Sequence, residues 1–213
     1  MAHTKGAQTR QAILDAAIVR FGRDGFRVTS VADIARDAGV GGTVAYAYFP
    51  SKEALFLAAV DEDAAGVIHE GLSALLEQAD FQAWRQSLIF TLIHAVDQHP
   101  LARRLLAGLE PDVTERVLEI PALNELRKAC AERLRAEQLA GRLRHDLDPV
   151  AIGNGVIAIT LSLLMSVVQI GGNTAITYAN DVAAVFDVAL GRPSPSKKRR
   201  DEATARLDAA PRV

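Results

Sequence analysis

The sequence predicts an all-α protein. Alanine and leucine, both strong helix formers, are abundant among the 213 residues, whereas aromatic residues make up only 5%. No stretch alternates apolar and polar residues with β-branched or aromatic side chains, as a half-buried strand would. Apolar residues instead recur at the three- and four-residue spacing of one helical face. We therefore expect helices throughout, in one large domain or two small ones.

The first helix is predicted from Thr9 to Asp24, and Gly25 ends it. One helical face carries Ala12, Ile13, Ala16, Ala17, Arg20 and Phe21, of which only Arg20 is polar. A second helix is predicted to begin at Thr29 or Ser30, because Ser30 and Asp33 have the spacing of a capping box. Its apolar side is formed by Val31, Ile34, Ala35 and Ala38.

A third short helix is predicted over residues 42–49 and ends at Pro50. Gly39 provides the turn before it, since a left-handed residue is strained with a Cβ. Helical spacing places Ala45 and Phe49 on the buried side, and Thr43, Tyr46 and Ala47 on the outer side. Two short helices joined by a glycine turn are typical of a helix-turn-helix, so the sequence predicts that this segment reads a DNA major groove.

The charges are distributed unevenly along the chain. Residues 1–52 contain seven Lys or Arg and four Asp or Glu, residues 53–191 contain ten and nineteen, and residues 192–213 contain seven and three. A basic head on an acidic body indicates that only the head meets a polyanion.

Longer helices are predicted beyond Pro50. Their ranges are 51–79, 80–98 with Asp80 as the cap, a short helix from Pro100, another between Pro111 and Pro121, 122–141, about 149–170, and 174–191. Asp148-Pro149 is a clear start, with an acidic cap followed by proline at the first helical position. After Pro149, small residues recur at steps of three and four, at Ala151, Gly155, Ala158, Ser162 and Ser166. This stripe permits close approach of another helix.

Several segments of the head strongly resemble the TetR family of bacterial transcriptional repressors. They are residues 9–14, Phe21 to Phe26, 29–35, 38–40, Tyr46, 48–49 and 51–55. The resemblance implies a helix-turn-helix domain at 8–68, a helical ligand-binding and dimerisation domain at 69–191, and a homodimer that places two heads in successive major grooves of a DNA operator. We expect the basic segment 192–213 to be a disordered tail.

The resemblance also implies the DNA contacts. Phosphates would be met by Thr29, Ser30, Tyr46, Tyr48 and Lys52, and base edges by Gly42, Thr43, Tyr46 and Ala47. Arg10, or an arm containing Lys5, would add a backbone or minor-groove contact. The third helix departs from the family pattern at Gly41, Gly42, Val44 and Ala47, which leaves few side chains able to make bidentate hydrogen bonds to a base. We therefore expect specificity to depend on DNA shape, water and apolar contacts.

A pocket for a small regulating molecule is expected within the body. Its candidate lining is Trp84, Leu88, Leu92, Leu106, Cys130, Asn154, Met165 and Gln169. The apolar bias of this set favours a hydrophobic or amphipathic effector. We expect neither an enzymatic activity nor a cofactor, because no catalytic motif or glycine-rich phosphate loop is present.

Two other classes of protein remain open. The uncharged stretch from Pro149 to Asn180 is long enough for a membrane span, although dispersed polar residues and Gly171-Gly172 argue against one. The scattered histidines leave a metal-binding helical protein as the second alternative. Cys130 is the only cysteine, which excludes an intrachain disulfide, and together with the absence of a secretory signal it favours the cytoplasm.

Overall fold

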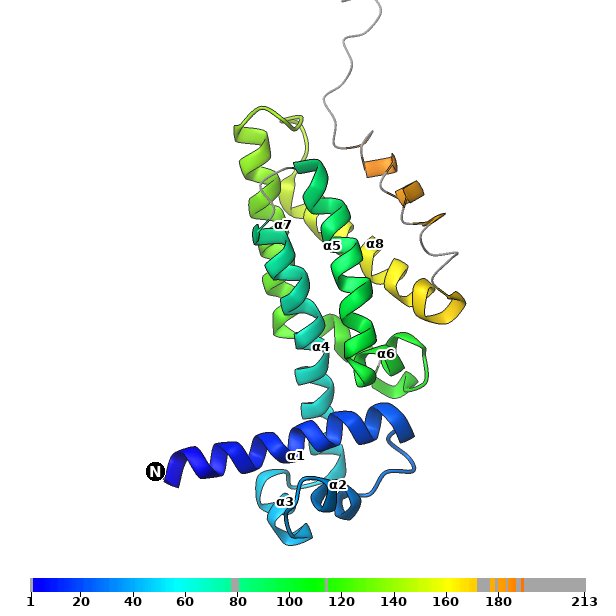
Figure 1. Ribbon diagram of the computed structural model, residues 1–213. Coiled ribbons are helices and arrows are strands. Elements are labelled where there is room, and N and C mark those ends of the chain that lie inside the picture. The colour runs from blue at the N-terminus through cyan, green and yellow to red at the C-terminus, as the bar shows by residue number, and fades with distance from the viewer. Residues whose placement is uncertain are drawn as a thin grey trace, which may run out of the picture.

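The computed structural model consists of a small helical head joined to a long helical body (Figure 1). It describes residues 2–77, 81–113, 115–171, 177–178, 180–182, 184–186 and 189. Within these ranges every regular element is helical, so the all-α prediction is confirmed. The predicted tail at 192–213 and the Asp80 cap lie outside the described residues, as does most of the predicted helix 174–191.

The head consists of α1 (Ala2–Asp24), α2 (Val31–Asp37) and α3 (Gly42–Tyr48). Helix α1 begins seven residues before the predicted start. The Thr9 hydroxyl donates to the Lys5 carbonyl, one turn earlier in the same helix, at 3.0 Å. Thr9 therefore lies inside the helix instead of capping it, and the predicted arm around Lys5 is helical.

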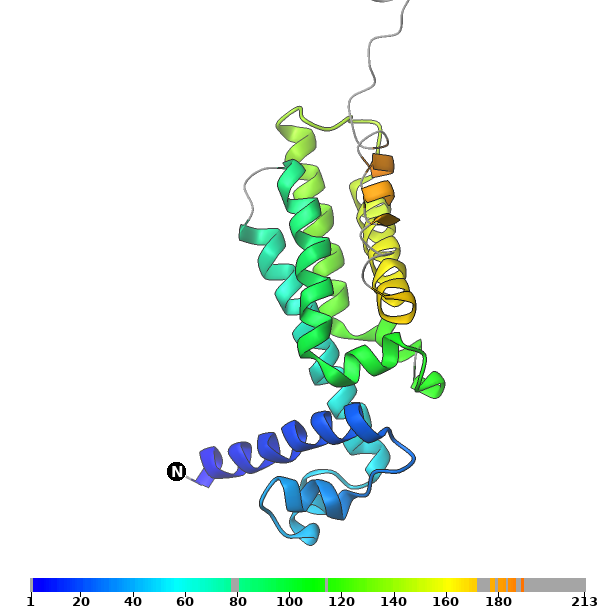
Figure 2. The same ribbon diagram turned by 45° about the vertical axis from the view of Figure 1, so that its right-hand side comes forward.

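The body contains α4 (Lys52–Glu77), α5 (Phe81–Gln98), α6 (Pro100–Leu106), α7 (Pro121–Leu139) and α8 (Pro149–Ile170). Helices α4, α5, α7 and α8 run along the length of the body, and α6 lies near its junction with the head (Figure 2). The helix predicted between Pro111 and Pro121 is instead two 3₁₀ turns, η1 (Pro111–Val113) and η2 (Glu115–Glu119). So short a segment, with proline at its start and just beyond its end, has no room for a stable α-helix.

Two apolar cores stabilise the two parts. The head core contains Ile13, Leu14 and Phe21 from α1, and the Phe21 and Phe56 rings meet edge to face with centroids 4.9 Å apart. It also contains Leu101 and Leu105 from α6. The head is therefore packed on α6, a helix from the middle of the chain. The predicted helix-turn-helix domain ends at residue 68, so it does not include these two residues of the head core.

The body core is formed mainly by α4, α5, α7 and α8. Leu88, Leu92 and Val96 of α5 are all buried, as their spacing predicted. Helix α8 has Asp148 as its N-cap, with the carboxylate accepting from the Val150 backbone N–H at 2.9 Å, and it ends at Gly171. Both ends agree with the sequence prediction.

Candidate nucleic-acid interface and internal cavity

The turn between α2 and α3 has the local geometry that the sequence predicts. Ser30 is the N-cap of α2, and its hydroxyl accepts from the Asp33 backbone N–H at 3.2 Å. The Asp33 carboxylate does not return a bond to the backbone of Ser30; it accepts from the Ser30 hydroxyl at 2.6 Å, and this bond lowers the pKa of Asp33. Gly39 has a φ of +68°, which confirms the left-handed turn.

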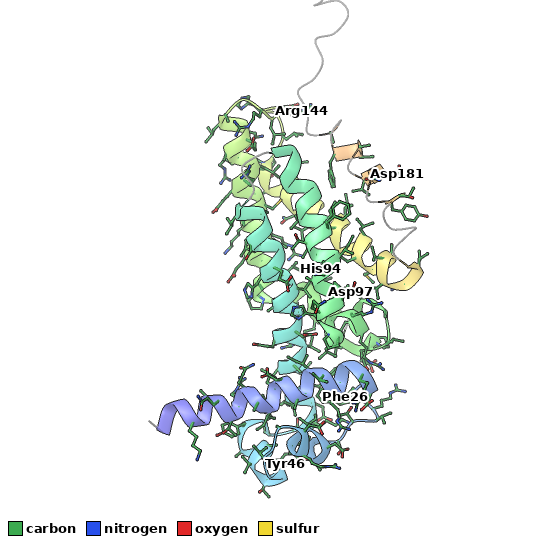
Figure 3. All side chains as sticks on the ribbon, viewed as in Figure 1. Phe26, Tyr46, His94, Asp97, Arg144 and Asp181 are labelled. Atoms are coloured by element: carbon green, nitrogen blue, oxygen red, sulfur yellow. The ribbon has the colours of Figure 1, made fainter. Side chains whose placement is uncertain are left out.

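Helix α3 has one buried and one exposed side. Ala45 is fully buried and the C-cap residue Phe49 is 4% exposed, so both pack into the head core. Thr43, Ala47 and Tyr46 are exposed, and Tyr46 lies at the end of the molecule farthest from the body (Figure 3). The predicted division of this helix into two sides is therefore correct. A Cβ added at Gly42 would meet nothing within 4 Å, so the start of the helix is also open.

Two cations lie against aromatic rings at the edges of this surface. The Arg10 guanidinium lies 5.0 Å from the centre of the Phe49 ring, and the Lys52 ammonium lies 4.5 Å from the centre of the Phe26 ring. Lys52 also donates to the Arg27 carbonyl at 3.3 Å, which uses one of its three N–H donors. Tyr48 is half-buried and packs on the head core.

Thr29 is the one expected DNA contact whose side chain the structure turns inward. It is 3% exposed, and its hydroxyl donates to the Gly25 carbonyl at 2.8 Å. A buried hydroxyl needs such a partner, and here it stabilises the end of α1. We therefore correct the prediction: Thr29 supports the loop between α1 and α2 and has no free hydroxyl for a phosphate. The other predicted DNA contacts are at least partly exposed.

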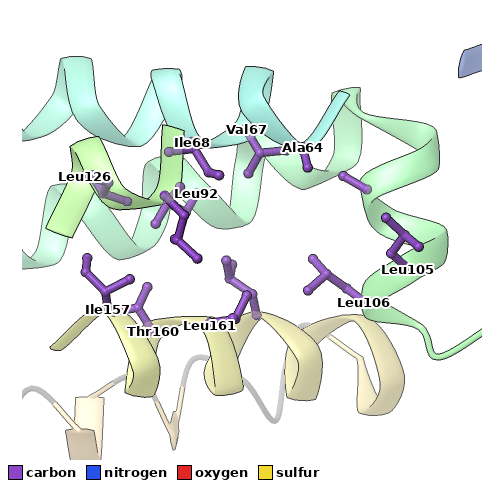
Figure 4. A pocket seen from close by; sticks show the side chains of 13 residues that line it. Ala64, Val67, Ile68, Leu92, Leu105, Leu106, Leu126, Ile157, Thr160 and Leu161 are labelled. Carbon is purple, nitrogen blue, oxygen red and sulfur yellow. The ribbon is translucent and has the colours of Figure 1, made fainter. Parts of the chain in front are cut away.

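An apolar cavity of about 60 Å³ lies in the body between α4, α5, α6, α7 and α8 (Figure 4). Its lining is Ala64, Val67, Ile68, Leu92, Ala102, Leu105, Leu106, Leu123, Leu126, Ile157, Thr160, Leu161 and Leu164. Thr160 is the only polar member, and its hydroxyl donates to the Val156 carbonyl at 2.8 Å. Such a cavity has room for only a few water-sized groups, so a larger ligand requires the helices to move apart.

The structure places only some of the predicted pocket residues at this cavity. Leu92 and Leu106 line it, whereas Leu88, Cys130 and Met165 belong to the surrounding core. Gln169 does not line the cavity itself, but its amide donates to the carbonyl of the lining residue Leu106 at 2.8 Å. The Trp84 side chain lies outside the described residues.

Asn154, which was predicted to line the pocket, does not line this cavity. It is exposed on α8 and borders a separate outer hollow that also contains Arg127 and Lys128 of α7. The other cavity residues, which lie on α4, α6, α7 and α8, were missed, because in the sequence nearly all of them are indistinguishable from other apolar core positions.

The comparisons with known proteins agree with this geometry. Residues 13–59 match the family model of bacterial regulatory proteins, tetR family. The chain carries a TetR-family DNA-binding domain. The resemblance found in the sequence is thereby confirmed, and with it a role in transcription regulation through DNA binding. No curated protein matches the sequence significantly.

Solved structures of TetR-type regulators share the fold of most of this chain. A TetR-family transcriptional regulator from Mesorhizobium loti is 22% identical, with a TM-score of 0.70 over 88% of this chain and 98% of that one. A fatty acid degradation regulator from Bacillus halodurans is 18% identical, with a TM-score of 0.64 over 83% and 93%. A ketosteroid transcriptional regulator of Mycobacterium tuberculosis is 20% identical, with a TM-score of 0.57 over 86% and 95%. At these identities the likeness concerns the fold.

Helix α8 of this TetR-type body is exposed along much of its apolar surface. It is long and apolar enough to cross a membrane, with a mean hydropathy of 2.0. Core helices of water-soluble proteins can have the same length and hydropathy. Ala151, Ala158 and Ser162, from the predicted stripe of small residues, are all exposed. Among the described residues, no cluster of three or more His, Cys, Asp or Glu side chains is arranged to hold a metal ion.

A chain of polar contacts joins α6 to the head. The Arg104 guanidinium donates to the Glu110 carboxylate at 2.7 Å, and the same oxygen accepts from the Phe26 backbone N–H at 3.1 Å. Phe26 lies in the loop that leads to α2. At the other end of α6, the buried Asp63 carboxylate of α4 accepts from the Leu101 and Ala102 backbone N–H groups, each at 2.8 Å. Helix α6 is thus bound to both the head and α4.

Proposed function

We propose that this TetR-family protein is a cytoplasmic, ligand-responsive repressor that binds a palindromic operator as a homodimer. A small hydrophobic or amphipathic effector releases it from DNA. The observation that carries the proposal is the outward side of α3, where Thr43, Tyr46 and Ala47 are exposed while Ala45 anchors the helix from behind.

The DNA contacts divide into two kinds. Tyr46, Tyr48, Ser30 and Lys52 are proposed to meet phosphates, because hydroxyl and ammonium donors position a protein on the backbone without reading sequence. Thr43, Gly42 and Ala47 are proposed to meet base edges. A threonine or alanine methyl group suits the methyl group of thymine, and the exposed backbone at Gly42 allows close approach.

The dimer is proposed to form through α8. Its exposed alanines and serine leave a surface on which a second helix can pack closely. In a homodimer with two-fold symmetry the same surface meets itself. Two heads in successive major grooves would be about 34–36 Å apart, so their spacing decides whether both can bind at once.

Helix α6 supports the coupling between effector and DNA. Leu105 belongs to the head core and also lines the cavity, so one side chain belongs to both sites. Because the cavity is small, a bound effector must displace its walls, and two of these walls, α4 and α6, contact the head. The effector releases DNA only if it binds more tightly to the displaced conformation.

Selection of operator sites from random DNA, followed by mobility-shift assays, tests the proposal. Lys52→Ala should weaken binding to all sequences alike and lower the salt slope by about one, because one phosphate contact is lost. Thr43→Ala should alter the preferred bases. Lys128→Ala removes an exposed lysine from the body and should change neither property. Unchanged DNA affinity and base preference in both head variants would show that α3 is not the reading helix.

A further inference from the structure

A second hollow, distinct from the outer hollow at Asn154, lies beside the apolar cavity and shares one wall with it. It has a volume of about 220 Å³ and lies between α5, α6 and α8. Leu164 of α8 lines both spaces, so its side chain is part of the wall that they share. Ile93, Val96, Val167 and Val168 continue the apolar lining into the second hollow.

The two spaces differ in polarity. Among the described residues that line the inner cavity none is charged, and the Thr160 hydroxyl already donates to the Val156 carbonyl. A polar head placed there would lose its hydrogen bonds to water without replacement. The second hollow has charged groups, since Asp97 of α5 and Arg103 of α6 both line it.

Arg103 already holds a carboxylate in this position. Its guanidinium forms an ion pair with the Asp97 carboxylate, and the two side chains are 51% and 56% exposed. A guanidinium has five N–H donors, and the hydrogen bond to Asp97 uses one nitrogen of the group. Exposed pairs of this kind contribute little to stability, so exchanging one carboxylate for another is inexpensive.

We propose that the effector is a single-chain amphiphile with a carboxylate head. Its chain passes Leu164 into the apolar cavity, and its head replaces Asp97 on Arg103. The inference rests on the proposed function, because it names the ligand of the same cavity. It also places the head of the ligand on α6, one of the helices that contact the DNA-binding head.

Calorimetric titration with decanoate and with 1-decanol tests the proposal, since the two probes share a chain length and differ in charge. Arg103→Gln should lower the affinity for decanoate at least tenfold and leave that for decanol within twofold. Asp97→Asn removes the competing carboxylate and should raise the affinity for decanoate several-fold. Both side chains are more than half exposed, so both variants should fold, which circular dichroism checks.

The path is tested separately. Leu164→Trp should fill the passage and lower the affinity for both probes, whereas Lys128→Gln, on the opposite side of the body core, should change neither. If Arg103→Gln lowers the affinity for both probes equally, or if Asp97→Asn does not raise the affinity for decanoate, the carboxylate assignment alone is wrong. If neither probe binds the unaltered protein, the proposal of an amphiphilic effector is wrong, and so is the apolar-effector part of the proposed function. The DNA-binding part of the proposed function is tested separately by the mobility-shift assays.

Discussion

The carboxylate of Asp63, in the middle of α4, accepts a hydrogen bond of 2.8 Å from the backbone N–H of Leu101 at the start of α6. The N-cap residue His99 makes no side-chain bond to this helix, so Asp63 takes the place of a local cap. The His99 ring contacts the same carboxylate, with its Nδ1 at 2.8 Å. A residue thirty-eight positions away in the sequence therefore fixes the first turn of the helix that joins cavity and head.

Asp63→Ala should destabilise the protein by about 3 kcal/mol, because it leaves buried backbone N–H groups without an acceptor. Urea unfolding followed by circular dichroism measures this change. Asp61→Ala is the matched control on the same helix: Asp61 pairs with Arg116, but both side chains are 39% exposed, so the loss should not exceed about 1 kcal/mol. Equal losses in the two variants would mean that Asp63 contributes no more than a surface ion pair.

Tyr46→Phe should weaken operator binding by about 1.5–3 kcal/mol if its hydroxyl donates to a phosphate. The fold should be unchanged, because Tyr46 is 53% exposed. Tyr48→Phe provides the comparison, since this half-buried ring also packs on the head core and is closer to α1. Mobility shifts on one selected operator measure both variants, and an unaltered affinity in Tyr46→Phe would remove Tyr46 from the phosphate contacts.

Burial raises the pKa of the Cys130 thiol from 9.0 to about 12. In the unfolded chain the thiol ionises near its ordinary pKa, whereas the folded protein keeps it neutral. This contribution to stability is therefore fully present below pH 9 and is lost as the pH rises from 9 to 12. The loss amounts to about 1.4 kcal/mol for each pH unit. Cys130→Ala should be less stable at neutral pH but should show a flatter decline, as measured by urea unfolding across this range.

Ala158→Glu should convert the proposed dimer to monomers. Ala158 is exposed on α8, so the monomer tolerates the glutamate, but two symmetry-related carboxylates at a close helix contact would repel each other. Operator affinity should fall about 10²-fold or more, because the two heads no longer bind as one unit. Analytical ultracentrifugation measures the oligomeric state. Leu139→Glu, 82% exposed at the end of α7, serves as the control and should leave a dimer.

Local sequence signals predicted much of the head. The capping pair Ser30 and Asp33, the turn at Gly39 and the spacing of Ala45 and Phe49 are each decided within a few residues, so α2 and α3 were placed correctly. The same applies to Asp148 and Gly171 at the ends of α8. The inward turn of Thr29 could not be predicted in this way, because both an exposed cap and a buried hydroxyl are compatible with threonine beside a helix start.

By itself the sequence determined the helical class, the ends of most helices, the outward side of α3 and the TetR resemblance. These depend on periodicity, caps and turn residues, all of which are short-range properties of the chain. Only the tertiary structure decided that Leu101 and Leu105 belong to the head core, that Asp63 caps α6, and that Leu164 lines two neighbouring hollows. Each of these is a contact between helices far apart in the sequence, and an apolar or acidic residue carries no local sign of which distant helix it will meet.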